Sequence, residues 1–331
     1  MNILVLDGQT NNPGDLSWQP VADLGNLTVY PRTASRELLS RAKDAQIILT
    51  NKVPLTRDVL DVLTRLRFIQ ILATGWNTVD VDYAARLGIP VSNIPDYSTD
   101  SVAQHVFAFL LHAFNQIQMH ADSVRQGDWS SCLDFSYSLV PMEELAGKTM
   151  GIVGYGRIGR KVASIARSFG MKVLAGRHPD GTIPRGCGED PLLEERDILP
   201  LQELFLQSSV ITLHVPLAAR TLEMIGGELL SRSPSDQILI NTARGGIVAE
   251  ADLILALDSR THGPRYYYTD VYSLEPPEPH PRLFDHPRVI VSPHRAWSSV
   301  RARQHLIQIA ADNIRGFLSG KPQNLVPSSS P

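Results

Sequence analysis

Three polar side chains with complementary chemistry each follow an apolar strand. Arg244 comes after the apolar run 238–240, Glu275 lies beyond a strand ending at Val271, and His294 lies beyond one ending at Val291. In a doubly wound sheet the carboxyl ends of the strands form the edge at which ligands bind, so the three side chains are expected to meet there. A single residue of any of these types at a strand end more often has a structural role. The three together, after a dinucleotide motif, favour a catalytic role.

Reduction of a small 2-keto acid by hydride transfer needs these three residue types. A guanidinium can bind the substrate carboxylate through two hydrogen bonds and polarise the keto oxygen. An imidazolium can protonate the alkoxide, but an isolated histidine has a pKa of ~6.5 and is mostly uncharged at neutral pH. A carboxylate beside the ring favours the protonated form and fixes the tautomer, and Glu275 is the candidate. We therefore predict His294 as general acid/base, assisted by Glu275, with Arg244 binding the substrate.

A glycine-rich loop upstream indicates the hydride donor. The predicted strand Thr149–Val153 leads into Gly154-x-Gly156-x-x-Gly159 and then into a predicted helix. In such a loop the first glycine allows a tight turn, the second lets the backbone approach a pyrophosphate, and the third lets helix and strand pack closely. The amides and dipole at the helix start favour the anion. Glycine-rich turns are common, but strand, motif, helix and second strand in this order predict a dinucleotide site rather than an ordinary turn.

The end of the second strand points to the type of dinucleotide. Sites for NAD place an acidic residue there to bind the adenosine ribose, whereas this chain reads VLAGRH over 173–178. Arg177 offers a cationic fork suited to a 2′-phosphate, and His178 could assist when protonated. A surface arginine that merely replaces the acid is the alternative. We expect NADP(H) to be favoured, with NAD(H) possible and no metal required.

Two series of strands and helices must position these residues. The first hundred residues alternate short apolar strands with amphipathic helices, which predicts a flavodoxin-like parallel sheet. The strands are expected at 3–6, 28–30, 46–50, 68–73 and 90–92, and the helices at 35–43, 56–64 and 79–86. A second series beginning at Lys148 predicts a Rossmann-type doubly wound sheet, so the fold class is α/β with two such domains. Its strands are expected at 149–153, 172–175, 210–213, 237–241, 266–271 and 288–291, with a helix at 157–169.

Two long helices complete the expected fold. One starts after Ser98 or Thr99 and carries apolar residues over so wide an arc that it needs more than one neighbour. It is expected to connect the domains and contact a second subunit, or else to lie buried within one domain. Its apolar positions are 102, 103, 106, 107, 110, 111, 114 and 117. The other helix is expected over 299–318, followed by a loose tail at 327–331.

Length and composition exclude several classes of protein. The 331 residues suggest two domains, and a net charge of −3 is unsuited to electrostatic binding of nucleic acid or of a membrane surface. Hydrophobic residues make up 43% of the chain, enough for a sizeable core. The two cysteines, Cys132 and Cys187, provide neither a disulfide framework nor a four-cysteine metal site. With no secretory leader or long apolar span, a cytoplasmic protein is expected.

Eight ordered motifs identify a family that the chain resembles. They are ATGWNTVD at 73–80, STDSVA at 98–103, GYGRIG at 154–159, HVPL at 214–217, NTARGGIV at 241–248, DVYSLEP at 270–276, SPH at 292–294 and GKPQN at 320–324. The chain resembles the D-isomer-specific 2-hydroxyacid dehydrogenases over nearly its whole length. It is most similar to their glycerate dehydrogenase and hydroxypyruvate/glyoxylate reductase branch.

The resemblance implies further roles. Residues 1–99 with 297–331 would form a substrate domain, 100–296 a cofactor domain, and a cleft between them would close on the substrate.

The resemblance also implies roles for single residues. Thr74 and Gly75 would bind the substrate carboxylate, and Lys52 could reach it, although an exposed lysine is the simpler interpretation. Asp270 would contact the nicotinamide amide, while His214 is expected to be structural. The remaining cofactor residues would be Val102, Tyr155, Arg157, Ile158, Val215, Pro216, Thr242 and Ala243. A homodimer through the cofactor domain is implied as well.

The chain departs from the family pattern at a few positions. Arg177 replaces the usual acid, three tyrosines precede Asp270 at 266–268, and Gln104-His105 stands where many relatives have a pair containing glutamate. Two other functions remain open: a cofactor-sensing regulatory protein on the same scaffold, and a dehydrogenase using another donor such as formate or phosphite. Formate specialists carry glutamine as the partner of the histidine, so Glu275 disfavours formate.

Overall fold

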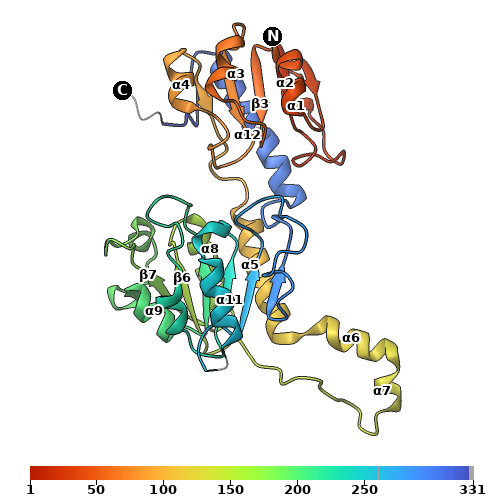
Figure 1. The fold of residues 1–331 in the computed structure, drawn as a ribbon, viewed down its shortest axis with the longest axis vertical. Helices are drawn as coiled ribbons and strands as arrows, with labels where there is room; N and C mark the ends of the chain where they lie inside the picture. The colour runs from red at the N-terminus through yellow and green to blue at the C-terminus, as the bar shows by residue number, and fades with distance from the viewer. Residues whose placement is uncertain (260, 328–331) are drawn as a thin grey trace. The chain divides into compact units, whose positions relative to one another are not determined.

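The chain forms two compact units. One comprises residues 1–98 and 298–331, and the other comprises residues 99–297. The computed structural model describes residues 1–259 and 261–327, so Arg260 and most of the expected loose tail, residues 328–331, lie outside the described part (Figure 1). Within the described part, every helix is too short or too polar to cross a membrane.

The first unit contains a five-stranded parallel sheet. Its strand order is β2-β1-β3-β4-β5, which is the order of flavodoxin-like doubly wound folds and confirms the expected class. The strands are β1 (Asn2–Val5), β2 (Asn26–Val29), β3 (Ile47–Thr50), β4 (Phe68–Ile71) and β5 (Val91–Ser92). All residues of β3 and β4 are buried, because helices cover both faces of the sheet, and this explains their mostly apolar sequences.

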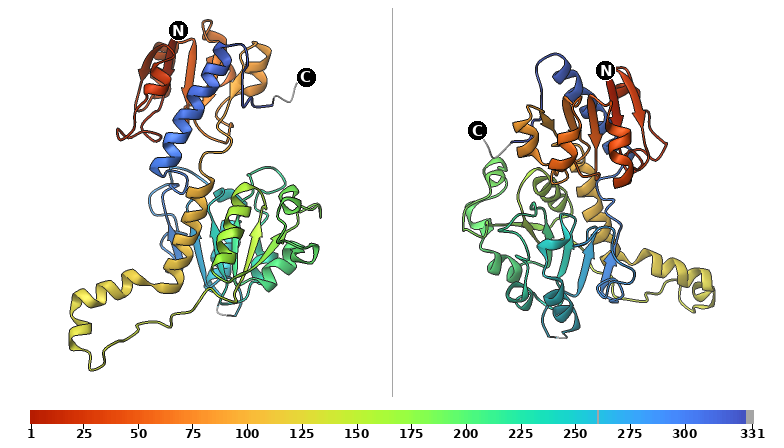
Figure 2. Two further views of the ribbon diagram at one scale, coloured as in Figure 1. Left: turned by 180° about the vertical axis from the view of Figure 1, so that it is seen from behind. Right: turned by 45° about the horizontal axis from the view of Figure 1, so that its top comes forward.

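The helices of the first unit come from both ends of the chain. They are α1 (Gln19–Ala22), α2 (Ser35–Ala42), α3 (Arg57–Val62), α4 (Val81–Arg86) and α12 (Val300–Leu318). α12 begins at a Ser299 cap, whose side chain accepts a hydrogen bond from the Ala302 amide. Near its other end Phe317 stacks on Phe68 of β4, with ring centroids 4.7 Å apart. The last helix therefore covers the sheet formed by the first hundred residues (Figure 2).

The second unit contains a seven-stranded parallel sheet in the order β12-β11-β10-β9-β6-β7-β8. Its strands are β6 (Thr149–Val153), β7 (Lys172–Gly176), β8 (Ile198–Leu199), β9 (Val210–Leu213), β10 (Ile238–Asn241), β11 (Tyr266–Thr269) and β12 (Val289–Val291). The strand order reverses at β6, which lies between β7 and β9, as in a Rossmann sheet. A ligand is expected at this reversal, beyond the carboxyl ends of the strands.

Helices cover this sheet on both faces. They are α5 (Thr99–Asn115), α8 (Arg157–Ser168), α9 (Leu201–Gln207), α10 (Gly227–Ser231) and α11 (Glu250–Asp258), with short 3₁₀ turns at Arg185–Glu189, Glu195–Asp197 and Gly245–Ile247. The apolar residues of α5 pack in one core with α8, β6 and Tyr268 of β11. The face of α5 that carries these residues is thus buried inside the second unit.

One expectation for the long helix is wrong. Ile117 does not continue its apolar stripe, because Gln116 adopts a left-handed conformation with φ 45° and ends α5 at Asn115. Ile117 instead begins α6 (Ile117–Gln126), which is followed by α7 (Asp128–Ser131). These two helices and the strand-free segment leading back to β6 form an arm that projects from the second unit (Figures 1 and 2).

Candidate active site

The three glycines of the loop after β6 occupy different environments. Gly154 has φ +97°, and a Cβ atom there would lie 2.5 Å from the His214 carbonyl oxygen. A Cβ at Gly159 would lie 2.3 Å from the Gly154 oxygen, whereas one at Gly156 would meet no atom of the described residues within 4 Å. The first and third glycines are therefore required by packing, while the second leaves an open backbone surface. This is the arrangement that a bound pyrophosphate needs.

The loop runs directly into α8, a twelve-residue helix with Gly156 as its N-cap. Arg157 and Ile158 occupy its first turn, and that turn holds no acidic residue. The backbone amides and the helix dipole at this end therefore face no competing negative charge from the turn itself. The residues present thus fit a dinucleotide phosphate.

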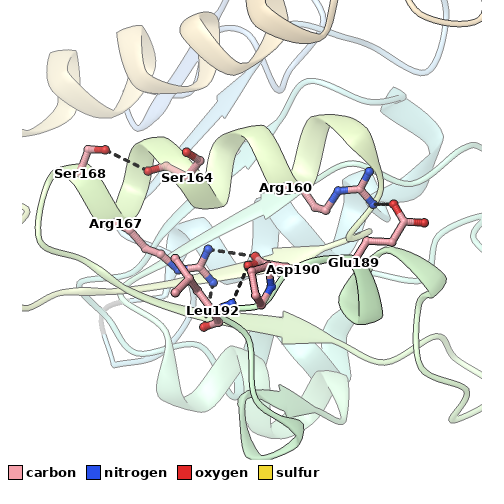
Figure 3. Close-up of a pocket in the computed structure, with 8 residues that line it drawn as sticks. Arg160, Ser164, Arg167, Ser168, Glu189, Asp190 and Leu192 are labelled. Atoms are coloured by element: carbon pink, nitrogen blue, oxygen red, sulfur yellow. Dashed lines mark hydrogen bonds and ion pairs between the residues drawn. The ribbon is translucent and has the colours of Figure 1, made fainter.

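The Tyr155 side chain points away from the loop surface. It is 1% exposed, and its hydroxyl donates a 2.6 Å hydrogen bond to Asp190 Oδ2. Arg167 of α8 donates to the same oxygen at 2.9 Å (Figure 3). Arg167 and Asp190 belong to the lining of a surface pocket of about 540 Å³ beside α8 (Figure 3). Only the backbone of Tyr155 is therefore available to a ligand at the loop.

The end of β7 carries Arg177 and His178. The Arg177 amide donates to the Leu199 carbonyl at 2.8 Å, which ties this end of β7 to β8. Its half-buried guanidinium lies 3.5 Å from the Gly181 carbonyl, and the His178 amide donates to Thr182. The strand tip therefore presents a cation at the position where an NAD site has an acid.

The other predicted cofactor residues fall on neighbouring segments of the same unit. Val215 packs against Gly154, and Pro216 beside it is exposed. Thr242 and Ala243 follow β10, and the Thr242 hydroxyl is buried with no hydrogen-bond partner among the described residues. Val102 lies in the second turn of α5 with 5% exposure. Val215 and Thr242 thus lie beyond β9 and β10, at the ligand edge of the sheet.

His294 and Glu275 are in direct contact. His294 Nδ1 lies 2.5 Å from Glu275 Oε2, and the other carboxylate oxygen accepts a 3.0 Å hydrogen bond from the Tyr272 amide. Both side chains are about three-quarters buried, with 28% exposed. Because an ionised carboxylate only accepts hydrogen bonds, Nδ1 carries a hydrogen in this contact. The Glu275 carboxylate is thus fixed from both sides.

The loop carrying Arg244 lies against the loop carrying Glu275. A Cβ at Gly245 would be 2.0 Å from the Tyr272 carbonyl carbon, so only glycine permits this approach. The exposed Arg244 guanidinium donates to the Ala243 carbonyl at 2.6 Å. Behind the loop, the buried Asn241 side chain donates to the Arg244 carbonyl at 2.9 Å. Asn241 was absent from the predicted site, although its place at the end of β10 could have indicated it.

Asp270 holds the segment that carries His294. It is 1% exposed and accepts hydrogen bonds from the Ser292 hydroxyl at 2.5 Å, the Arg295 amide at 2.9 Å and the Ala296 amide at 2.7 Å. The nicotinamide contact expected of Asp270 stays a prediction, and this supporting role was not predicted from the sequence. This role leaves little trace in the sequence, because two of the three donors are backbone amides, which any residue type could supply.

His214 lies at the end of β9, where its Nε2 is 3.0 Å from the Thr212 hydroxyl. Burial lowers the pKa of this imidazole to about 3. The ring is therefore uncharged at neutral pH and has no proton of suitable acidity to give. This agrees with the structural role expected for it.

The predicted substrate residues Lys52, Thr74 and Gly75 lie in the first unit. The Lys52 amide donates a 2.6 Å hydrogen bond to Asp7, which also accepts from the Asn51 amide. The Thr74 hydroxyl donates to the Ile94 carbonyl at 2.8 Å. These bonds fix the backbones of both loops, which follow β3 and β4 at the carboxyl edge of their own sheet.

The doubly wound sheet and its glycine loop define a dinucleotide-binding α/β protein, and comparisons with known proteins narrow this class. Residues 107–296 match the family "D-isomer specific 2-hydroxyacid dehydrogenase, NAD binding domain". The chain is 40% identical over 331 residues to a hydroxypyruvate reductase of Blautia hydrogenotrophica, covering 98% of this chain and 99% of that protein. It is also 40% identical over 292 residues to a glycerate dehydrogenase of Methylorubrum extorquens, covering 88% of each.

A solved structure supports the same conclusion. An NADPH-dependent glyoxylate/hydroxypyruvate reductase from Sinorhizobium meliloti, solved with NADP and malonate, superposes with a TM-score of 0.77 at 26% identity. The match covers 98% of this chain and 96% of that one. The chain belongs to the D-isomer-specific 2-hydroxyacid dehydrogenases, a family of NAD(P)-dependent enzymes, as the resemblance implied.

Proposed function

We propose that this enzyme reduces a small 2-keto acid, hydroxypyruvate or glyoxylate, and prefers NADPH. The observation that carries the proposal is the contact between His294 Nδ1 and a Glu275 carboxylate that is itself held by the Tyr272 amide. Such a contact orients the ring and directs its other nitrogen outward. The names of the relatives at 40% identity support the choice of substrate.

In this proposal each of the three side chains has a separate role. His294 Nε2 protonates the keto oxygen during reduction and removes the hydroxyl proton in the reverse direction. Glu275 stabilises the imidazolium and keeps Nδ1 protonated. Arg244 binds the substrate carboxylate through two hydrogen bonds and polarises the carbonyl. The loop Gly154–Gly159 would hold the dinucleotide, which would supply the hydride, and the residues that would flank its riboses are Val215, Pro216, Thr242 and Ala243.

The preference for NADPH rests on Arg177. Its guanidinium follows β7, where an acid would otherwise accept hydrogen bonds from the ribose diol, and a cation there favours a 2′-phosphate. His178 adds to this charge when protonated. The family description names NAD and the related reductase uses NADPH, so both occur among similar proteins. Within this proposal Arg177 decides between them.

We assign the remaining roles by unit. Residues 1–99 with 297–331 form the substrate domain, in which Thr74, Gly75 and Lys52 bind the substrate carboxylate. Residues 100–296 form the dinucleotide domain, in which Val102 and Asp270 complete the cofactor site. The two free cysteines fit a reducing compartment such as the cytoplasm.

We also assign a homodimer. Eight large apolar side chains on the arm at 116–142 are exposed, an unusual concentration for a projecting segment. They are Ile117, Met119, Val124, Trp129, Leu133, Phe135, Leu139 and Met142. A second copy of the chain would bury them against its own dinucleotide domain.

The test is a panel of initial-rate assays. Glyoxylate, hydroxypyruvate, pyruvate and phosphonooxypyruvate are each assayed with NADPH and with NADH. We expect the largest kcat/KM for hydroxypyruvate or glyoxylate with NADPH. No turnover of any acid with either dinucleotide would reject the enzyme in favour of a cofactor-sensing protein, and a larger kcat/KM with NADH would reject the cofactor preference.

A further inference from the structure

A histidine outside the proposed catalytic set reaches the segment that carries His294. His105 lies on α5, and its Nε2 is 2.9 Å from the hydroxyl oxygen of Ser292. The same hydroxyl donates a 2.5 Å hydrogen bond to Asp270 Oδ1, and His105 Nε2 is 3.6 Å from that oxygen. Three side chains from α5, the end of β12 and the end of β11 thus form one connected network.

The proton count fixes the direction of these bonds. A serine hydroxyl has one hydrogen, and an ionised carboxylate can only accept. Ser292 therefore gives its hydrogen to Asp270, and His105 Nε2 must donate to the Ser292 oxygen. Burial of the ring lowers the pKa of His105, the charge of Asp270 partly opposes this effect, and the charge of Arg295 adds to it. At neutral pH the ring is the uncharged tautomer with a hydrogen on Nε2.

The network ends on the backbone around His294. Asp270 accepts hydrogen bonds from the amides of Arg295 and Ala296, and its own carbonyl accepts one from the His294 amide at 2.8 Å. His294 has φ +48°, a left-handed conformation that is uncommon for residues other than glycine. Such a conformation persists only where surrounding bonds enforce it. The carboxylate orientation of Asp270 is therefore part of what sets the direction of the His294 side chain.

We propose that His105 is a positioning residue for the proposed catalytic acid, acting through Ser292 and Asp270 on the segment 292–297. The proposal rests on the proposed function only for the role of His294. The Gln104-His105 pair was the departure from the family pattern to which the sequence alone assigned no effect. Its histidine supplies the outermost donor of the network, and loss of that donor loosens the segment without touching the dinucleotide loop.

The test compares two single variants, their double variant, a conservative variant and a control by kinetics. His105→Leu removes the donor, and Ser292→Ala removes the bridge from the other side. Losing one such bond corresponds to a fall in kcat of about 3–10-fold for either variant. The double variant falls no further than the worse single one, because both act through one chain. His105→Gln, whose amide can still donate, recovers most of the lost kcat, and His112→Leu on the exposed side of the same helix serves as control.

A second readout does not depend on activity. Hydrogen exchange of the amides of Arg295 and Ala296 becomes faster in His105→Leu and Ser292→Ala, while that of the loop at 154–159 is unchanged. Additive losses in the double variant, or unaltered exchange over 294–296 in both single variants, would overturn the proposal. If the wild-type protein reduces no keto acid, the proposed function fails and the exchange measurement alone decides the positioning role. If His105→Leu does not fold, Ser292→Ala reports on the same network.

Discussion

At the scale of single residues, the environment of His294 gives the two nitrogens of its ring different roles. Nδ1 faces Glu275, whose second oxygen is occupied by the Tyr272 amide, so the carboxylate cannot rotate away without breaking that bond. His214, at the end of β9, has a different environment, in which burial lowers the pKa of its imidazole to about 3. Two histidines at strand ends of one sheet thus differ in chemistry because of their neighbours and not because of their type.

His294→Ala tests the acid/base role. The variant should lose about 10²–10⁴-fold in kcat, the usual scale for removal of a general acid. Initial rates of keto-acid reduction at saturating NADPH measure the loss. His262→Ala, a change at an exposed histidine of the same unit, should keep the wild-type rate. A kcat for His294→Ala within about twofold of the wild type would exclude the role.

Arg177→Asp tests the preference for the dinucleotide. The carboxylate repels a 2′-phosphate and can accept hydrogen bonds from a ribose diol, so the ratio of kcat/KM for NADPH to that for NADH should fall at least about tenfold. Arg185→Asp, at a position in the same segment whose side chain is 98% exposed, is the matched control for charge. An equal fall in both variants would mean that general electrostatics, not a phosphate contact, sets the preference.

At the scale of elements, the glycine loop between β6 and α8 must both pack closely and leave room for a dinucleotide. Variants at different glycines can distinguish these two requirements. Gly159→Ala places a Cβ against the Gly154 carbonyl and should lower the free energy of unfolding by about 1–3 kcal/mol. Gly156→Ala meets open space, so its unfolding temperature should stay near that of the wild type while dinucleotide affinity falls. Thermal unfolding and calorimetric titration with NADPH measure the two effects. Unchanged affinity in Gly156→Ala would place the pyrophosphate elsewhere.

The contact of Tyr155 and Arg167 with Asp190 joins this loop to the segment after β7. Burial alone would raise the pKa of the Asp190 carboxyl, but its hydrogen bonds from Tyr155 and Arg167 outweigh burial and lower it. A carboxyl whose folded-state pKa is lowered adds stability above its unfolded pKa of ~3.9, and the addition is lost as the pH falls through the folded value.

Asp190→Asn should therefore cost about 1.5–3 kcal/mol of unfolding free energy at pH 7, the range for hydrogen bonds to a charged group. The difference from the wild type should shrink below about pH 4. Urea unfolding of both proteins from pH 3 to pH 7 measures it. A difference that stays constant over this range would show that the charge of Asp190 contributes nothing.

Most elements that carry the site could be predicted from the sequence, because they are bounded by strong local signals. β6 and β9 fall where they were expected, at Thr149–Val153 and Val210–Leu213. β8 has only two residues and leaves no periodic pattern. The break at Gln116 has neither glycine nor proline to mark it. The supports of the site, Asp270 above all, depend on contacts between residues far apart in the chain, which no local pattern encodes.

At the scale of the whole molecule, the proposed homodimer can be tested at the projecting arm. Leu133→Glu together with Phe135→Glu places two charges on side chains that are 102% and 91% exposed in the single chain. If a second copy covers the arm, the variant should elute as a monomer where the wild type is a dimer, as measured by light scattering after gel filtration. Leu206→Glu, on an exposed position of α9, should leave the dimer intact. A wild-type monomer at micromolar concentration would contradict the assignment.

Because α12 covers the first sheet, the unit that begins the chain is completed only when the end of the chain has been made. Phe68 leaves the ribosome long before Phe317, its stacking partner, and at ~5–20 residues per second the interval is roughly 10–50 s. During that time residues 99–297 emerge, while the strands at the start of the chain still lack their last covering helix. A nascent chain therefore finishes its middle first, and one that stops short of α12 leaves its earliest strands without their cover.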